Sequence, residues 1–218
     1  TANVSHELKT PLQSIIGSVE LLENDLVQPE DRPRFLGRIH QEAQRLVSLI
    51  NDILGLSQLD EGAAMPRESV SLLSLAQEAA ASLSAAAQAQ NVTLTVNGTA
   101  GTLTGVRRLL SETVRNLCEN AVKYNVPGGS ITVTVAETPR AVTLTVADTG
   151  IGIPPADQSR VFERFYRVDK SHSRAIGGTG LGLSIVKHAV AYHHGTVQLD
   201  STPGQGTVIT VTLPKDAA

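Results

Sequence analysis

Residues 116–124 have the sequence NLCENAVKY, and they are followed by DTGIG at residues 148–152 and GTGLG at residues 178–182. If the first segment is helical, its two asparagines, Lys123 and Tyr124 share one face. Amide oxygens on such a face can hold a hard cation such as Mg²⁺, which prefers oxygen ligands. Glycines that precede a helical pattern let backbone N–H groups approach phosphates at the helix N-terminus. Together the three segments meet the requirements of an ATP–metal site.

Two further segments complete the pattern, HELKTP at residues 6–11 and FERFYR at residues 162–167. In chain order, the five segments resemble the H, N, G1, F and G2 boxes of the sensor histidine kinases of two-component signalling. The likeness covers nearly the whole chain. The segment Asn125–Gly129 also resembles the phosphate-responsive subgroup of these kinases.

The resemblance implies an ATP-dependent protein-histidine kinase that phosphorylates itself on His6 and passes the phosphoryl group to an aspartate on the receiver domain of a response regulator. A carboxylate such as Glu7 can orient or deprotonate the imidazole. The resemblance also implies a phosphatase activity toward that regulator, in which Thr10 positions a water. Asn120 is implied as the ligand of Mg²⁺, and Asn116 as a neighbour of the transferring phosphate. The other implied nucleotide contacts are Lys123, Tyr124, Asp148, Gly150, Gly152, Ile153, Gly178, Thr179, Gly180, Leu181 and Gly182.

The direction of His6 follows from helical geometry. At about 100° per residue, His6 falls about 200° and Thr10 about 240° from Val4, so both lie outside the apolar arc and face solvent. An exposed histidine on a helix is usually an ordinary surface residue, but the nucleotide site downstream requires an acceptor. Thr10 has an alternative structural role, a local hydrogen bond before the helix bend expected at Pro11.

The N-terminal region predicts a helical hairpin. Apolar residues from Val4 to Leu26 and from Phe35 to Ile53 recur at helical spacing on either side of the turn-forming residues 28–33. A lone hairpin cannot cover both apolar stripes, so we expect a homodimer whose hairpins form a four-helix bundle. The alternative is that both stripes pack on the C-terminal part of the chain.

The C-terminal region predicts an α+β sandwich, which the resemblance places in the Bergerat (GHKL) ATP-binding fold. Alternation with a period of two marks strands, and helical patterns lie between them at about residues 71–90, 105–124 and 180–193. The expected strands fall at residues 92–96, 131–135, 142–146, 196–199 and 208–213.

 The strands are expected to share one mixed sheet with the helices on one of its faces. We therefore expect a dimerisation and phosphotransfer hairpin at residues 1–62, a linker at 63–70 and an ATP-binding domain at 71–218.

Residues 154–176 are too long for a plain connection within a compact domain, and we expect them to form a lid over the nucleotide. A lid cation that closes over the γ-phosphate is a common means of stabilising phosphoryl transfer. Arg167 is the first candidate for this cation and Lys170 the second.

Composition narrows the choice of partners. The 218 residues carry a net charge of −3, so they show no basic surface for nucleic acid. The single cysteine, Cys118, is expected to be a small buried residue in a reducing compartment. The chain has no apolar run of membrane-spanning length, yet it begins at Thr1 within a helical pattern. We therefore expect a cytoplasmic fragment whose missing upstream residues anchor the protein in a membrane.

Two other functions share parts of this pattern. ATP-hydrolysing clamps that resemble gyrase and heat-shock ATPases carry a glutamate four residues before the metal-binding asparagine, where this chain has Asn116. A non-catalytic dimeric nucleotide-binding module would show a damaged box, and none is evident. His193 and His194 match no box and are interpreted as surface residues. Thr104 is the candidate cap of the helix that carries the asparagines.

Overall fold

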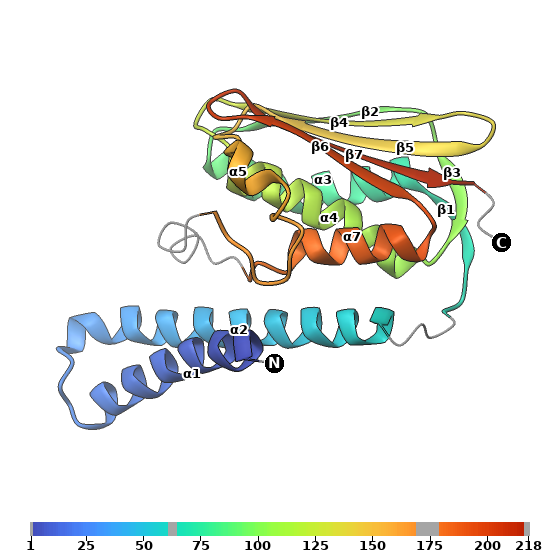
Figure 1. The fold of residues 1–218 in the computed structure, drawn as a ribbon. Coiled ribbons are helices and arrows are strands. Elements are labelled where there is room, and N and C mark those ends of the chain that lie inside the picture. The colour runs from blue at the N-terminus through green and yellow to red at the C-terminus, as the bar shows by residue number, and fades with distance from the viewer. Residues whose placement is uncertain (1, 61–64, 169–178, 216–218) are drawn as a thin grey trace.

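The computed structural model describes residues 2–60, 65–168 and 179–215. Its N-terminal part is a hairpin of two long helices, α1 (Ala2–Glu23) and α2 (Arg32–Asp60), joined through the short 3-10 helix η1 (Pro29–Asp31). Helix α1 continues through Pro11. Pro33 lies in the first turn of α2, where a missing N–H costs little. The predicted hairpin is thus confirmed, and it lies along one side of the remaining domain (Figure 1).

The C-terminal part contains a mixed five-stranded sheet in the order β2-β4-β5-β7-β6. Strands β2 and β4 are parallel, and the other neighbours are antiparallel. The strands are β2 (Thr93–Gly98), β4 (Ser130–Glu137), β5 (Ala141–Asp148), β6 (Thr196–Thr202) and β7 (Gly206–Pro214). A separate antiparallel pair, β1 (Glu68–Ser71) with β3 (Thr102–Gly105), was not predicted from the sequence.

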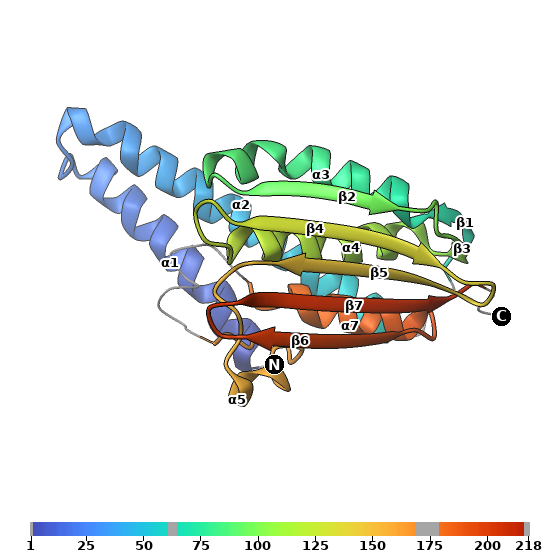
Figure 2. The same cartoon turned by 90° about the horizontal axis from the view of Figure 1, so that it is seen from above.

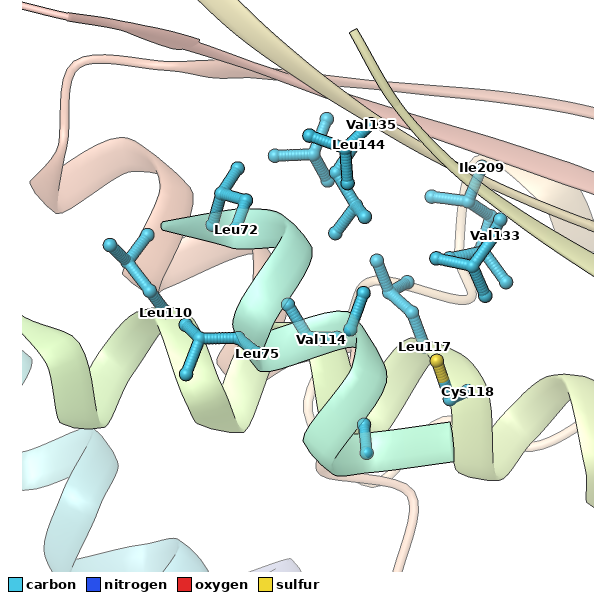
Figure 3. Packing of buried hydrophobic residues seen from close by; sticks show 14 of the residues in the cluster. Leu72, Leu75, Leu110, Val114, Leu117, Cys118, Val133, Val135, Leu144 and Ile209 are labelled. Atoms are coloured by element: carbon cyan, nitrogen blue, oxygen red, sulfur yellow. The ribbon is translucent and has the colours of Figure 1, made fainter. Parts of the chain in front are cut away.

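Three helices cover one face of the sheet, as Figures 1 and 2 show: α3 (Leu72–Ala89), α4 (Arg107–Lys123) and α7 (Gly182–Tyr192). Apolar side chains from α3 and α4 meet those of the central strands (Figure 3), and this contact forms the main core. Cys118 lies within the core, and burial raises its pKa to about 12. The expected role of Cys118 as a small buried residue is confirmed. The α+β sandwich is confirmed as well.

Helix α4 is capped by a residue that was expected on the surface, His193. The α4 N-cap is Val106, whose side chain cannot accept a hydrogen bond. Instead, the Val106 N–H donates to His193 Nε2 at 2.9 Å, and the other ring nitrogen of His193 lies 2.7 Å from the Ala189 carbonyl oxygen. Burial lowers the pKa of His193, which favours the neutral ring that can accept this bond. The expectations of a surface His193 and a Thr104 cap were therefore wrong.

Candidate active site

The two asparagines lie on α4, the helix at the centre of the helical layer. Asn116 donates from Nδ2 to the Glu112 carbonyl oxygen at 2.9 Å, one turn earlier in the helix. Its other amide atom faces the start of α7, because a Cβ added at Gly182 would lie only 2.8 Å from Asn116 Oδ1. Glycine at position 182 therefore allows the end of the glycine loop to approach the asparagine helix closely.

The carboxylate turn lies against the C-terminal end of the same helix. Asp148 ends β5, and its Oδ1 accepts hydrogen bonds from the N–H groups of Gly150 at 2.8 Å and Thr207 at 3.2 Å. The Ile151 N–H donates to the Tyr124 carbonyl oxygen at 3.0 Å. A Cβ at Gly150 would lie 2.3 Å from that same oxygen, so the turn requires glycine. Burial raises the pKa of Asp148, while its two backbone donors oppose this rise.

Strand β6 fixes the second half of this turn. The Ile153 N–H donates to Ser201 Oγ at 2.8 Å. Gly152 has a positive φ of 68°, a conformation that favours glycine, and a Cβ there would lie 2.2 Å from the Thr202 carbonyl oxygen. The turn after β5 is therefore held from two sides, by α4 and by β6.

Cations converge where α4 ends. The pKa of Lys123 is lowered to about 8, chiefly by burial and further by the positive charges of Arg167 and Arg45. Lys123 Nζ also lies 5.5 Å from the centre of the Tyr124 ring. An anion with several charges would relieve the repulsion that Lys123 experiences from the two arginines, and the phosphates of a nucleotide fit this requirement. An ATP site is thus consistent with the residues present.

A metal ion at this site would depend on amide and phosphate oxygens. Within residues 4–57, 65–168 and 179–215, no cluster of three or more His, Cys, Asp or Glu residues could hold a metal by itself. The half-buried Asn120 faces away from the main core and offers an amide oxygen, a ligand type that Mg²⁺ accepts. Mg²⁺ would therefore arrive with the nucleotide.

The described part of the expected lid is more ordered than a plain loop. It contains the short helix α5 (Pro155–Gln158), and the Tyr166 hydroxyl donates to Asp157 in that helix. Phe165 has a positive φ of 65°, and its N–H donates to the Gly180 carbonyl oxygen at 2.9 Å. This bond ties the lid to the glycine loop. Lys170 and Gly178 lie outside the described residues.

The lid arginine contacts the helix that carries His6. Arg167 Nη2 lies 3.2 Å from Glu7 Oε2, and the Arg167 side chain is only 6% exposed. His6 itself is exposed, as predicted. Thr10 is half-buried, and its hydroxyl donates to the His6 carbonyl oxygen at 3.1 Å. This is the local hydrogen bond that was expected if Thr10 has a structural role. The link between Arg167 and Glu7 could not be foreseen, because 160 residues separate them.

The hairpin packs on the catalytic domain through part of its apolar surface. Leu49 and Leu56 of α2 form a buried cluster with Leu181 and Ile185 of the glycine loop and α7. Other apolar residues of the hairpin remain exposed: Leu12, Ile16, Leu21, Leu26, Leu36, Val47, Ile50 and Leu54. One face of α2 therefore packs on the C-terminal domain, so the alternative arrangement holds for part of the hairpin. The exposed residues remain available to another partner.

Two family models match this chain. Residues 105–217 match the histidine kinase-, DNA gyrase B- and HSP90-like ATPase family, and residues 1–62 match the His Kinase A phosphoacceptor domain. The chain belongs to the sensor histidine kinases. Its relatives include the sensor-like histidine kinase SenX3 of Mycolicibacterium smegmatis, which is 38% identical over 98% of this chain and 56% of its own length. This histidine kinase chain thus spans about half the length of the curated relatives it matches.

Solved histidine kinases share the fold. The histidine kinase AdeS of Acinetobacter baumannii superposes with a TM-score of 0.81 over 97% of this chain and 98% of its own, at 18% identity. The full-length histidine kinase ShkA, solved in complex with AMPPNP, gives a TM-score of 0.74 at 28% identity and covers the whole chain and 46% of its own. The shared architecture therefore includes the hairpin as well as the ATP-binding domain.

Family membership also bears on the two alternative functions. Asn116 occupies the position at which the ATP-hydrolysing clamps carry the glutamate that activates water, and an amide cannot act as that base. Each box of the kinase that the structure describes is packed against another one: Gly182 meets Asn116, Gly150 meets Tyr124, and Phe165 binds Gly180. The clamp and the inactive nucleotide-binding module are therefore not favoured.

Proposed function

We propose that this chain is the catalytic core of a protein-histidine kinase, which uses ATP with Mg²⁺ to phosphorylate His6 and then phosphorylates an aspartate of a response regulator. The ion pair between Arg167 and Glu7 carries the proposal. It joins the cationic end of the candidate ATP site to the residue next to the phosphoacceptor. The AMPPNP bound by ShkA supports a nucleotide in the same fold.

The roles of the individual residues follow from their chemistry. A neutral His6 ring attacks the γ-phosphorus with a nitrogen lone pair; the N–P bond forms while the bond to the leaving ADP oxygen breaks. Glu7 orients the ring or takes its proton, and Arg167 and Lys123 stabilise charge on the phosphates. Bound Mg²⁺ would neutralise phosphate charge, with Asn120 as its protein ligand.

The exposed apolar residues of the hairpin support a homodimer. On α2, Ile50 and Leu54 point roughly 130° away from Leu49 and Leu56, which pack on the catalytic domain. A second hairpin could therefore cover Ile50 and Leu54 without displacing that domain. On α1, Leu12 and Ile16 lie one turn apart and are both about half exposed. A four-helix bundle built from two chains would bury these residues.

Other parts of the proposal concern the whole protein. The sensor-like kinase SenX3 supports a full-length sensor in which the core is linked to upstream segments, and the phosphate-responsive subgroup remains a proposal on the same basis. Among the described residues, no helix is long and apolar enough to cross a membrane. Attachment to a membrane would therefore come from a part of the protein outside these residues.

The phosphoacceptor is tested directly by replacing His6 with glutamine. Incubation of the unmodified chain with Mg²⁺ and radiolabelled ATP should give an acid-labile, alkali-stable phosphoryl adduct, and His6→Gln should reduce it to background. His40→Gln, which changes another exposed histidine of the hairpin, serves as the control and should keep full labelling. Full labelling of His6→Gln would show that the acceptor lies elsewhere.

The role of Thr10 requires two activities to be measured on one protein. If its hydroxyl orients a water toward a phospho-aspartate, Thr10→Ala should lose most phosphatase activity toward the regulator and retain much of its autokinase activity. If the hydroxyl serves only its bond to the His6 carbonyl oxygen, the variant should dephosphorylate the regulator at the original rate. Thr10→Ser retains a hydroxyl and provides the matched control.

A further inference from the structure

The described residues of the glycine loop, Thr179 to Gly182, are held by different parts of the molecule. The Gly180 carbonyl oxygen binds Phe165 of the lid, and Gly182 packs against Asn116 of α4. Thr179 and Leu181 contact α2 of the hairpin. The hairpin therefore contributes directly to the support of the loop that is expected to bind phosphates.

A short hydrogen-bond relay runs from α2 into this loop. The Thr179 hydroxyl donates to Asp52 Oδ2 at 3.1 Å, and the same hydroxyl oxygen accepts from the Leu181 N–H at 3.3 Å. Leu181 is fully buried and is the N-cap residue of α7. The relay thus links a carboxylate on the hairpin to the backbone at the start of α7.

Among the described residues, the Thr179 hydroxyl donates the side-chain hydrogen bond that Asp52 accepts. Burial raises the pKa of Asp52, and the hydrogen bond from Thr179 is the largest influence that lowers it. Arg115 on α4 has a weaker electrostatic effect, and its side chain pairs with Glu119 at 3.3 Å. A cleft of about 270 Å³ between α2 and α4 borders Asp52, so a changed side chain there can be accommodated.

We propose that Asp52 is a positioning residue for phosphoryl transfer, which fixes Thr179 and the glycine loop when the hairpin is docked on the catalytic domain. The inference rests on the proposed kinase function. Because Asp52 belongs to the hairpin, any movement of α2 that separates it from Thr179 removes one support of the loop. The position of the hairpin is thereby coupled to the geometry around the phosphates, beyond its role of presenting His6.

The test is a double-mutant cycle on autophosphorylation, with Asp52→Ala, Thr179→Val and the combined variant. A hydrogen bond to a charged acceptor is lost in each, so each single change should lower kcat about tenfold. Thr179→Val also removes the acceptor of the Leu181 N–H, so its loss should be at least as large as that of Asp52→Ala. The combined variant should fall no further than Thr179→Val alone, because Asp52 acts through the Thr179 hydroxyl. The KM for ATP should change much less in Asp52→Ala, since the residue affects the docked arrangement used in transfer.

Conservative variants separate positioning from a general loss of structure. Thr179→Ser keeps the hydroxyl and should stay within about twofold of the original kcat, and Asp52→Asn, which keeps the shape but weakens the acceptor, should be intermediate. Asn51→Ala alters an exposed neighbour that borders the same cleft, and it should leave kcat unchanged. Thermal unfolding of each variant should show a midpoint close to that of the original chain.

The outcomes distinguish the two proposals. Absence of phosphorylation in the original chain would contradict the proposed function. Normal phosphorylation of the original chain together with an unchanged kcat in Asp52→Ala would contradict only the role of Asp52. Losses that multiply in the combined variant would show that Thr179 and Asp52 act separately, which also overturns the relay.

Discussion

Asn120→Ala should abolish autophosphorylation of His6, with a loss of roughly 100-fold or more in rate. Asn120 lies on the same helix as Asn116 and Lys123, at the end of α4 where the cations converge. Without its amide oxygen, Mg²⁺ loses its expected protein ligand, and phosphate charge is left less well neutralised. The rate of phosphoryl transfer is measured with radiolabelled ATP at saturating Mg²⁺.

The hairpin should be unaffected by this change, because its exposed apolar residues lie on other helices. Sedimentation should therefore show the proposed dimer in Asn120→Ala as well as in the original chain. Asn97→Ala, which removes an exposed amide on β2, provides the matched control and should retain full activity. Loss of the dimer together with activity would show instead that the hairpin and the ATP-binding domain depend on one another for folding.

Local sequence patterns predicted the elements of the fold well. Period-two alternation located the five strands of the main sheet, and helical spacing located the hairpin and the three covering helices. The pair of β1 and β3 escaped prediction because each strand has only four residues, too few for a clear alternation. Short strands of this kind depend on their partner for stability.

Contacts between distant residues were the part that sequence patterns could not supply. His193 caps α4 from 87 residues away, and no local signal marks it as a cap. The same holds for Asp52, which is 127 residues from Thr179 and looks like an ordinary polar residue of an amphipathic helix. The box motifs identify which residues belong to the site. The supports of those residues appear only when the chain is folded.

One such contact predicts the direction of phosphoryl transfer within the proposed homodimer. Glu7 directly follows His6 and pairs with Arg167 of its own chain at 3.2 Å. The next residue, Leu8, packs on a cluster that α2 shares with Leu181 and Ile185. The apolar residues available to a second hairpin lie on a different face of α2. We therefore expect each catalytic domain to phosphorylate His6 of its own subunit.

Mixed dimers test this expectation. One subunit carries His6→Gln with an intact ATP site, and the other carries Asn120→Ala with an intact phosphoacceptor; differently tagged subunits are purified together so that only mixed dimers remain. If transfer occurs within one subunit, both chains of this mixed dimer should stay unlabelled. In the control dimers, which combine the original chain with either variant, only the original subunit should be labelled. Labelling of His6 on the Asn120→Ala subunit at the original rate would show transfer between subunits, and the pairing of Arg167 with Glu7 would then belong to a state other than the one that transfers phosphate. Labelling of the original subunit in each control shows that a catalytic domain can still dock on a hairpin in a mixed dimer.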